Sequence, residues 1–137
     1  MPMEFTVENG VLTAYDGHSS RVKIPEGVTA IGNRVFAERA ELASVTFPKT
    51  LETIGAEAFF RCTHLRWVLL PEGVRAIGDR GFYGCEHIMS VQLPKGIQTI
   101  GREAFAYCRS LEEVTVPAGA EVGQGAFDNC PKLRMKR

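Results

Sequence analysis

A period of 23 residues runs through most of this chain and limits what it can fold into. Prolines recur at that interval, at Pro25, Pro48, Pro71, Pro94 and Pro117. An Ile-Gly pair, a phenylalanine and a cysteine recur in step with them. Self-similarity at a fixed period is typical of repeat architectures, in which one supersecondary unit stacks on the next. The period therefore predicts a solenoid.

One repeat reads L-x-x-V-x-L-P-x-x-V-x-x-I-G-x-x-A-F-x-x-C-x-x. Complete copies begin at Leu42, Leu65, Ile88 and Leu111. A partial copy enters at Val22, and Leu133 begins a last strand without a complete repeat behind it. The alternation in L-x-x-V-x-L predicts a short strand, which the proline ends because it has no N–H to donate. We expect the glycine after isoleucine to adopt a positive φ at a corner, and Ala-Phe-x-x-Cys to form a return turn.

Burial explains why the repeats must stack. A single repeat has too few apolar positions to close a core, whereas stacked coils place valine over valine with parallel strands about 4.8 Å apart. Two outer columns alternate in charge along the stack, and neighbours in them should form weak ion pairs between coils. The first column is Glu26, Lys49, Glu72 and Lys95, and the second is Arg34, Glu57, Arg80 and Glu103.

The first 21 residues do not repeat. Asn9-Gly10, the dipeptide favoured in type I′ turns, lies between Phe5-Thr-Val-Glu and Val11-Leu-Thr-Ala-Tyr15. We therefore expect residues 1–21 to form a β-hairpin cap over the first open coil. Residues 22–137 should form the solenoid, with about five coils of 23 residues, and the whole should be one structural domain.

Composition excludes several classes of partner. The 16 basic side chains balance the 16 acidic ones, so bulk charge gives no reason to expect nucleic acid. No apolar stretch approaches the roughly 18 residues of a membrane span, so we expect no membrane insertion. The start of the chain shows no signal peptide. These features predict a cytoplasmic location if Met1 is the natural start, and a cell-surface or secreted one if the chain is a fragment of a larger protein.

The sequence offers no catalytic motif and no metal site. Cys62, Cys85, Cys108 and Cys130 are separated by 23, 23 and 22 residues. A column of thiols cannot surround a zinc ion tetrahedrally, so we expect them to be reduced, structural and protected from solvent. His64 and His87 share a column that we interpret as solvent-facing rather than metal-binding. We expect no enzyme activity and no cofactor.

The positions that vary between repeats indicate where a partner could bind. The x residues of L-x-x-V-x-L should point outward from the sheet, and among them are the tryptophan, a methionine and an arginine, types enriched in binding hot spots. The predicted binding residues are Arg66, Trp67, Leu69, Met89, Gln92 and Glu113. A second variable patch, with Phe60 and Tyr83 side by side, is interpreted as packing on the convex side.

The repeat pattern, over residues 22–133, resembles the BspA-like leucine-rich repeat, also called the Treponema pallidum type. The resemblance implies a β-rich, right-handed leucine-rich repeat superhelix, arc-shaped, with a parallel sheet on its concave side. It also implies the roles usual in that family, which are binding of host proteins, adhesion and aggregation by surface-exposed bacterial proteins. The family has no catalytic residues to carry over.

Two hypotheses for function follow. The first is a non-catalytic protein-binding module, an adhesive or host-interacting segment of a bacterial surface protein, whose protein partner the sequence does not identify. The alternative is an intracellular scaffold or a self-assembling structural repeat. For the alternative, we expect a weak homodimer through the C-terminal coil, formed by Val122, Phe127, Leu133 and Met135.

Overall fold

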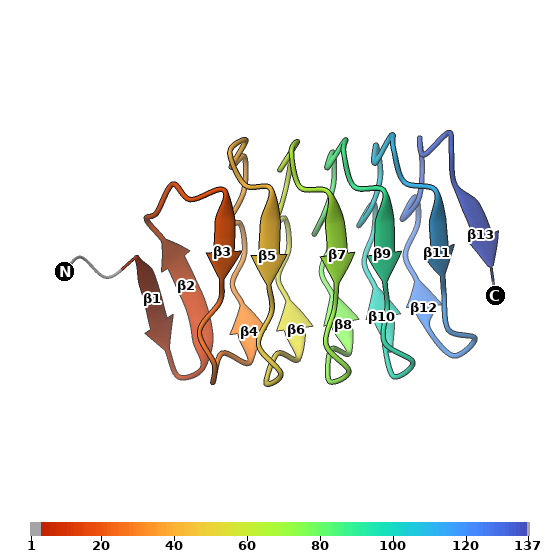
Figure 1. Ribbon diagram of the computed structural model, residues 1–137. Coiled ribbons are helices and arrows are strands. Elements are labelled where there is room, and N and C mark those ends of the chain that lie inside the picture. The colour runs from red at the N-terminus through yellow and green to blue at the C-terminus, as the bar shows by residue number, and fades with distance from the viewer. Residues whose placement is uncertain (1–3, 137) are drawn as a thin grey trace.

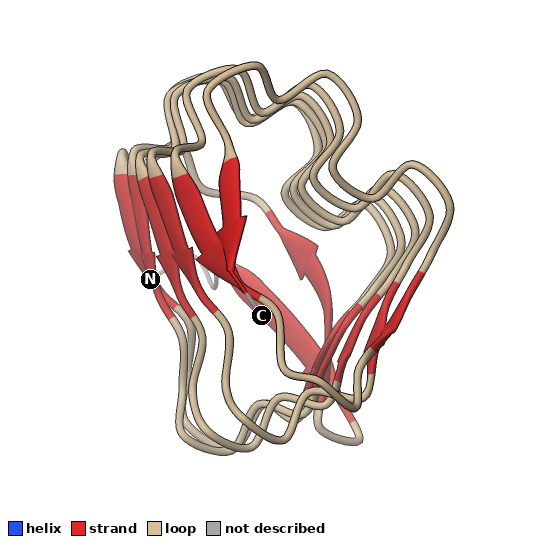
Figure 2. Ribbon diagram, turned by 90° about the vertical axis from the view of Figure 1, so that its right-hand side faces the viewer, coloured by secondary structure: helices blue, strands red, loops and turns tan. Residues whose placement is uncertain are grey.

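A computed structural model describes residues 4–136 of the chain, so residues 1–3 and 137 lie outside the description. The chain winds into about five stacked coils, and the described residues contain strands and turns but no helix (Figure 1). It follows that no helix among them could span a membrane. Viewed along the stack, each coil has three sides, with a strand on two of them and a run of turns on the third (Figure 2).

The predicted L-x-x-V-x-L strands are present and stand side by side as a front row (Figure 1). Their pairing is parallel and in register, with Val22 opposite Val45 and Val68 opposite Val91. The valine side chains of this column therefore point inward, as expected. The front row consists of β3 (Arg21–Lys23), β5 (Ser44–Thr46), β7 (Trp67–Leu69), β9 (Ser90–Gln92), β11 (Glu113–Thr115) and β13 (Arg134–Lys136).

A second sheet, the back sheet, lies behind the front row and was not predicted. Its seven strands lie in the order β1-β2-β4-β6-β8-β10-β12. All but the first two have only two residues, too few for a visible alternation in the sequence. The strands are β1 (Phe5–Glu8), β2 (Val11–Tyr15), β4 (Ala30–Ile31), β6 (Thr53–Ile54), β8 (Ala76–Ile77), β10 (Thr99–Ile100) and β12 (Glu121–Val122).

The N-terminal hairpin forms as predicted. Strands β1 and β2 pair antiparallel, and Asn9 and Gly10 both have a positive φ, of 52° and 82°, as a type I′ turn requires. The hairpin also continues the back sheet, because β2 pairs parallel with β4. The ring of Tyr15 lies 5.0 Å from that of Phe36, and the ring of Phe5 lies 5.2 Å from Tyr15. The cap therefore extends the aromatic core by two rings.

The core is a stack of phenylalanine rings. Successive rings are nearly parallel, with centroids 5.0 Å apart for Phe36 and Phe59 and 5.5 Å apart for Phe105 and Phe127. This spacing is close to the separation of hydrogen-bonded strands, about 4.8 Å. The rings and the backbone ladder therefore share one repeat distance, and every inner ring is fully buried.

The expectation for the Ile-Gly pair is wrong. None of the five glycines of this column has a positive φ. Glycine is required in this column because the neighbouring coil approaches closely. A Cβ on Gly78 would lie 2.6 Å from the Ala56 nitrogen. Instead, each coil places two other residues in the left-handed region. One of these positions holds Arg34, with φ 59°, and its equivalents in the other coils. The other position holds Arg61, with φ 54°, and its equivalents.

One of the two predicted charge columns forms ion pairs. Glu57 lies between Arg34, which donates to it, and Arg80, whose Nη1 lies 3.6 Å from Glu57 Oε2. Arg80 Nε also donates to Glu103 Oε1 at 2.7 Å, so the four residues form a continuous ladder along the stack. Within residues 4–136, no ion pair joins the members of the column that begins at Glu26.

The last strand pairs one residue out of step with the repeat pattern. The spacing of the preceding repeats would place Lys136 in the valine column, whereas the backbone of Met135 lies opposite Val114. A slip of one residue exchanges the two faces of a strand. Met135, and not Lys136, is therefore the backbone partner of Val114.

A pair of glycine substitutions tests the close approach of the coils. Gly78→Ala should lower the free energy of unfolding by about 1–3 kcal/mol, because backbone of the preceding coil occupies the space of the new methyl group. Gly96→Ala is the matched control, since nothing lies within 4 Å of its Cβ position, and it should be neutral or slightly stabilising. Urea denaturation of both variants measures the difference, and equal effects would contradict the explanation.

Candidate functional site

The outward face of the front row carries the predicted binding residues, and all of them are exposed to solvent. Trp67 is 51% exposed, Leu69 61% and Met89 48%. These are three of the five large apolar side chains that are exposed among the described residues. Monomeric proteins rarely cluster such side chains at the surface without a reason. The structure therefore gathers the predicted apolar residues on one face of two neighbouring coils.

Charge varies along the same face. Arg21 and Lys23 lie on β3, whereas Glu113 lies on β11 with Glu112 directly before it. The apolar patch of β7 and the start of β9 lies between these two regions. In the pairing of the strands, Trp67 is opposite Ser90, which is in turn opposite Glu113. A partner that crosses the strands would meet basic, apolar and acidic side chains in turn.

The apolar patch lies beside a seam in the front row. The row is divided into two ladders, β3-β5 and β7-β9-β11-β13. Near the seam, the Arg66 nitrogen donates to the Ala43 carbonyl at 3.3 Å, but β5 and β7 do not pair along their length. In the coil that contains β5, Phe47 occupies the inner leucine position of the repeat. Its ring is only partly buried and meets the Phe59 ring edge-on. Trp67 therefore stands at the edge of the four-stranded ladder.

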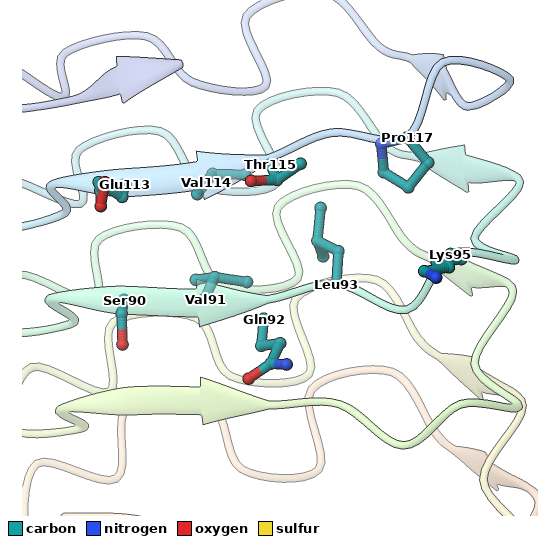
Figure 3. A pocket seen from close by; sticks show the side chains of 9 residues that line it. All are labelled: Ser90, Val91, Gln92, Leu93, Lys95, Glu113, Val114, Thr115 and Pro117. Atoms are coloured by element: carbon teal, nitrogen blue, oxygen red, sulfur yellow. The ribbon is translucent and has the colours of Figure 1, made fainter. Parts of the chain in front are cut away.

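A cleft of about 530 Å³ opens where β9 and β11 separate (Figure 3). These two strands pair only at Ser90 and Glu113, whereas β7 and β9 pair at three positions. The two strands are not paired beyond Ser90. The side chain of Leu93 points toward β11 and lines the cleft (Figure 3). Gln92 and Glu113, two of the predicted residues, also line this cleft. Sequence reasoning missed Leu93, because the repeat pattern assigns it to the buried column.

The cysteine column is structural, and each thiol has a specific partner. Cys62 Sγ donates to the Phe36 carbonyl at 3.0 Å, and the other three cysteines bond in the same way to the phenylalanine of the preceding coil. Arg39, which replaces cysteine in the first coil, donates to Tyr15 and Gly17 carbonyls in the same role toward the cap. All four cysteines are free, but Cys130 is only half-buried, contrary to the expected protection.

The two histidines of the repeat lie against one another. The rings of His64 and His87 stack with centroids 5.5 Å apart, and His87 Nδ1 lies 2.6 Å from the Thr63 carbonyl oxygen. Both side chains are exposed, as expected. In the part of the chain that the structure describes, no group of three or more His, Cys, Asp or Glu side chains could hold a metal ion.

A family comparison identifies the repeat. The model for the BspA-type leucine-rich repeat region matches residues 14–134 in six copies. The chain belongs to the BspA-type leucine-rich repeat family. Members of leucine-rich repeat families are generally structural or binding modules, which agrees with an exposed and variable sheet face on a repetitive core. A search of curated proteins found no match.

Solved structures support the same fold. A leucine-rich repeat protein of T. pallidum is 31% identical to this BspA-type chain, with a TM-score of 0.87 over 90% of the chain. A leucine-rich repeat protein of Bacteroides ovatus is 32% identical, with a TM-score of 0.81 over 96% of it. The pneumococcal vaccine antigen PcpA is 25% identical, with a TM-score of 0.72 over 80% of it. The chain spans 60%, 38% and 28% of these three proteins respectively.

The thiol column gives a prediction about reactivity. Burial raises the pKa of Cys62 to about 12, and also raises the pKa values of Cys85, Cys108 and Cys130. A raised pKa keeps a thiol protonated at pH 8, where only the thiolate reacts. Ellman's reagent should therefore label only the half-buried Cys130 in the folded protein, and slowly. Denaturation should release four reactive thiols, and Cys130→Ser should remove the reactivity of the folded state. Rapid labelling of more than one thiol would contradict this assignment.

Proposed function

We propose that the outward face of the front row binds a protein partner, with Trp67, Leu69 and Met89 at the centre of the interface. The observation that carries the proposal is the exposure of these three apolar side chains in adjacent coils of a scaffold that does not need them outside. Tryptophan and methionine are enriched in binding interfaces, and hot spots usually cluster near the centre of the contact.

The surroundings of the patch fit the anatomy of an interface. Arg66 adjoins Trp67, Gln92 lies opposite Leu69, and Glu113 lies one strand further along. These polar side chains would form a rim around the apolar centre, as in known protein interfaces. The cleft between β9 and β11 offers a recess into which a partner's side chain could insert.

We further propose that the chain acts as an adhesive or host-interacting segment of a bacterial surface protein. The support for this finer function is its kinship with longer bacterial repeat proteins. One of these, PcpA, is described as a pneumococcal vaccine antigen. A repeat module with a variable exposed face suits such a role, because the face can change while the stacked core stays the same.

A substitution at the centre of the patch tests the interface. Trp67→Ala should weaken binding to a captured partner by at least about 2 kcal/mol, or roughly thirtyfold, as for a hot-spot residue. Val7→Ala is the matched control, since Val7 is also exposed, at 43%, but lies on β1 of the back sheet. Affinity capture followed by calorimetry with the purified partner measures both. Equal affinities for Trp67→Ala and the intact chain would exclude this face.

A second candidate, self-association through the last coil, rests on Val122. This residue of the edge strand β12 is 38% exposed, and the neighbouring Phe127 stacks on Phe105 while remaining only partly buried. Two chains that met at this end would cover both residues. Lys132 and Arg134 lie near the same end, so like charges would make the contact weak.

Sedimentation at increasing protein concentration tests this candidate. The intact chain should form a weak dimer that strengthens with salt, because salt screens the like charges. Val122→Lys should keep the chain monomeric at all concentrations, whereas Val7→Lys, the control at the opposite end, should leave the dimer unchanged. A monomer that persists to millimolar protein would rule this candidate out.

A further inference from the structure

The third side of the coils is formed by the turns between the back sheet and the front row (Figure 2). The sequence places a group of half-buried aromatic side chains on these turns. The rings of Phe60 and Tyr83 stack with centroids 5.2 Å apart. The ring of Tyr107 lies 5.3 Å from that of Tyr83, tilted by 52°. The sequence predicts packing for Phe60 and Tyr83, and the two rings do pack on one another. Arginine side chains lie around these rings.

Two arginines lie on these rings. The Arg61 guanidinium lies 5.4 Å from the Phe60 ring centroid and 5.9 Å from that of Tyr83. The Arg109 guanidinium lies 5.4 Å from the Tyr107 ring centroid. Cation–π contact positions a guanidinium without occupying its N–H donors. Among the described residues, neither side chain has a carboxylate or another hydrogen-bond acceptor as partner, whereas Arg80 is neutralised by Glu57 and Glu103.

Both arginines line one cleft, together with Gly84. Arg61, Gly84 and Tyr107 occupy the same position in three successive coils, and all three have a positive φ. The outer two project long side chains, but Gly84 projects none. A Cβ on Gly84 would lie 3.0 Å from Arg61 Cγ, so the glycine leaves room for the Arg61 side chain to lie against it. A cleft of about 310 Å³ lies beside them. Besides this glycine, the lining consists of Arg61, Thr63, Tyr83, Glu86, Tyr107 and Arg109.

The lining specifies the chemistry of a ligand. Guanidinium groups with free donors suit an oxyanion, to which arginine forms paired hydrogen bonds. Glu86 can accept hydrogen bonds from hydroxyl groups, while Thr63 offers a neutral hydroxyl. The tyrosines provide apolar ring surface. The volume is near the lower end for ligand sites, about 300 Å³, which suits a single ring.

We propose that this cleft binds an acidic monosaccharide unit. The carboxylate lies between Arg61 and Arg109, the hydroxyl groups face Glu86 and Thr63, and the ring rests against Tyr107. A free sugar acid and a sugar acid at the end of a glycan present the same groups. The site lies on a different side of the coils from the front row. A test of this cleft is therefore independent of a test of the protein-binding face.

Titration of ¹⁵N-labelled protein followed by NMR tests the proposal. Sodium glucuronate and N-acetylneuraminate are the probes. Glucose lacks the carboxylate, sulfate lacks the ring, and N-acetylglutamate carries a carboxylate on a peptide-like frame. At least one sugar acid should shift the amide signals of Gly84 and Tyr107, with saturation, and the three controls should not. Absence of any shift with both sugar acids would overturn the proposal. An equal response to glucose, sulfate or N-acetylglutamate would also overturn it.

Substitutions then locate the binding. Arg61→Gln and Arg109→Gln should each weaken it at least about tenfold, because a hydrogen bond to a charged group is worth that much. Gly84→Asn should also weaken it strongly, because its Cβ would lie 3.0 Å from Arg61 Cγ and would push that side chain out of place. The variant should fold, because Asn129 occupies the same left-handed position in a later coil. Arg75→Gln, which removes the ion pair with Glu52 outside this cleft, is the control and should bind normally. If Gly84→Asn folds and binds like the intact chain, the cleft is not the site.

Discussion

Each coil of this protein buries its apolar side chains only against the coils on either side, and the distance between coils is set by the backbone ladder. Parallel strands pair about 4.8 Å apart. The phenylalanine rings stack at 5.0–5.5 Å, and the Ile-Gly column removes every Cβ that would hold the coils apart. Stability is therefore a sum of neighbouring interfaces. A side chain that enlarges one interface would disturb the contact of both coils that share it.

The same constraint separates the scaffold from the surface available for recognition. Inner positions must repeat, because each inner side chain stacks on its own equivalent. Outer positions are free to vary, and here they place Trp67, Leu69 and Met89 on the front row. A glycine in an outer column has a different effect, since Gly84 leaves room for the Arg61 side chain and lines a cleft together with Arg61 and Tyr107. Variation at outer positions thus produces both protruding and recessed surface features, while the stacking of the buried side chains stays the same.

Departures from regular stacking also matter for function. The front row is interrupted between β5 and β7, next to Trp67, and β9 and β11 separate beyond Ser90. Both irregularities lie on the face that carries the exposed apolar side chains. The coil with Phe47 in place of the usual aliphatic residue borders the first of them. Local mismatch in the core therefore shapes the surface above it.

The sequence by itself determined the solenoid, the front strands, the phenylalanine and cysteine columns and the hairpin with its Asn9-Gly10 turn, because each rests on a periodic or strictly local signal. It also predicted which front-row side chains are exposed, since alternation along a strand decides which way they point. Only the tertiary structure decided the back sheet, the reason for the Ile-Gly glycines, the register of β13 and the clefts beside Leu93 and Gly84. These features depend on distances between neighbouring coils, and a repeat pattern gives the order of the residues but not how closely two coils approach.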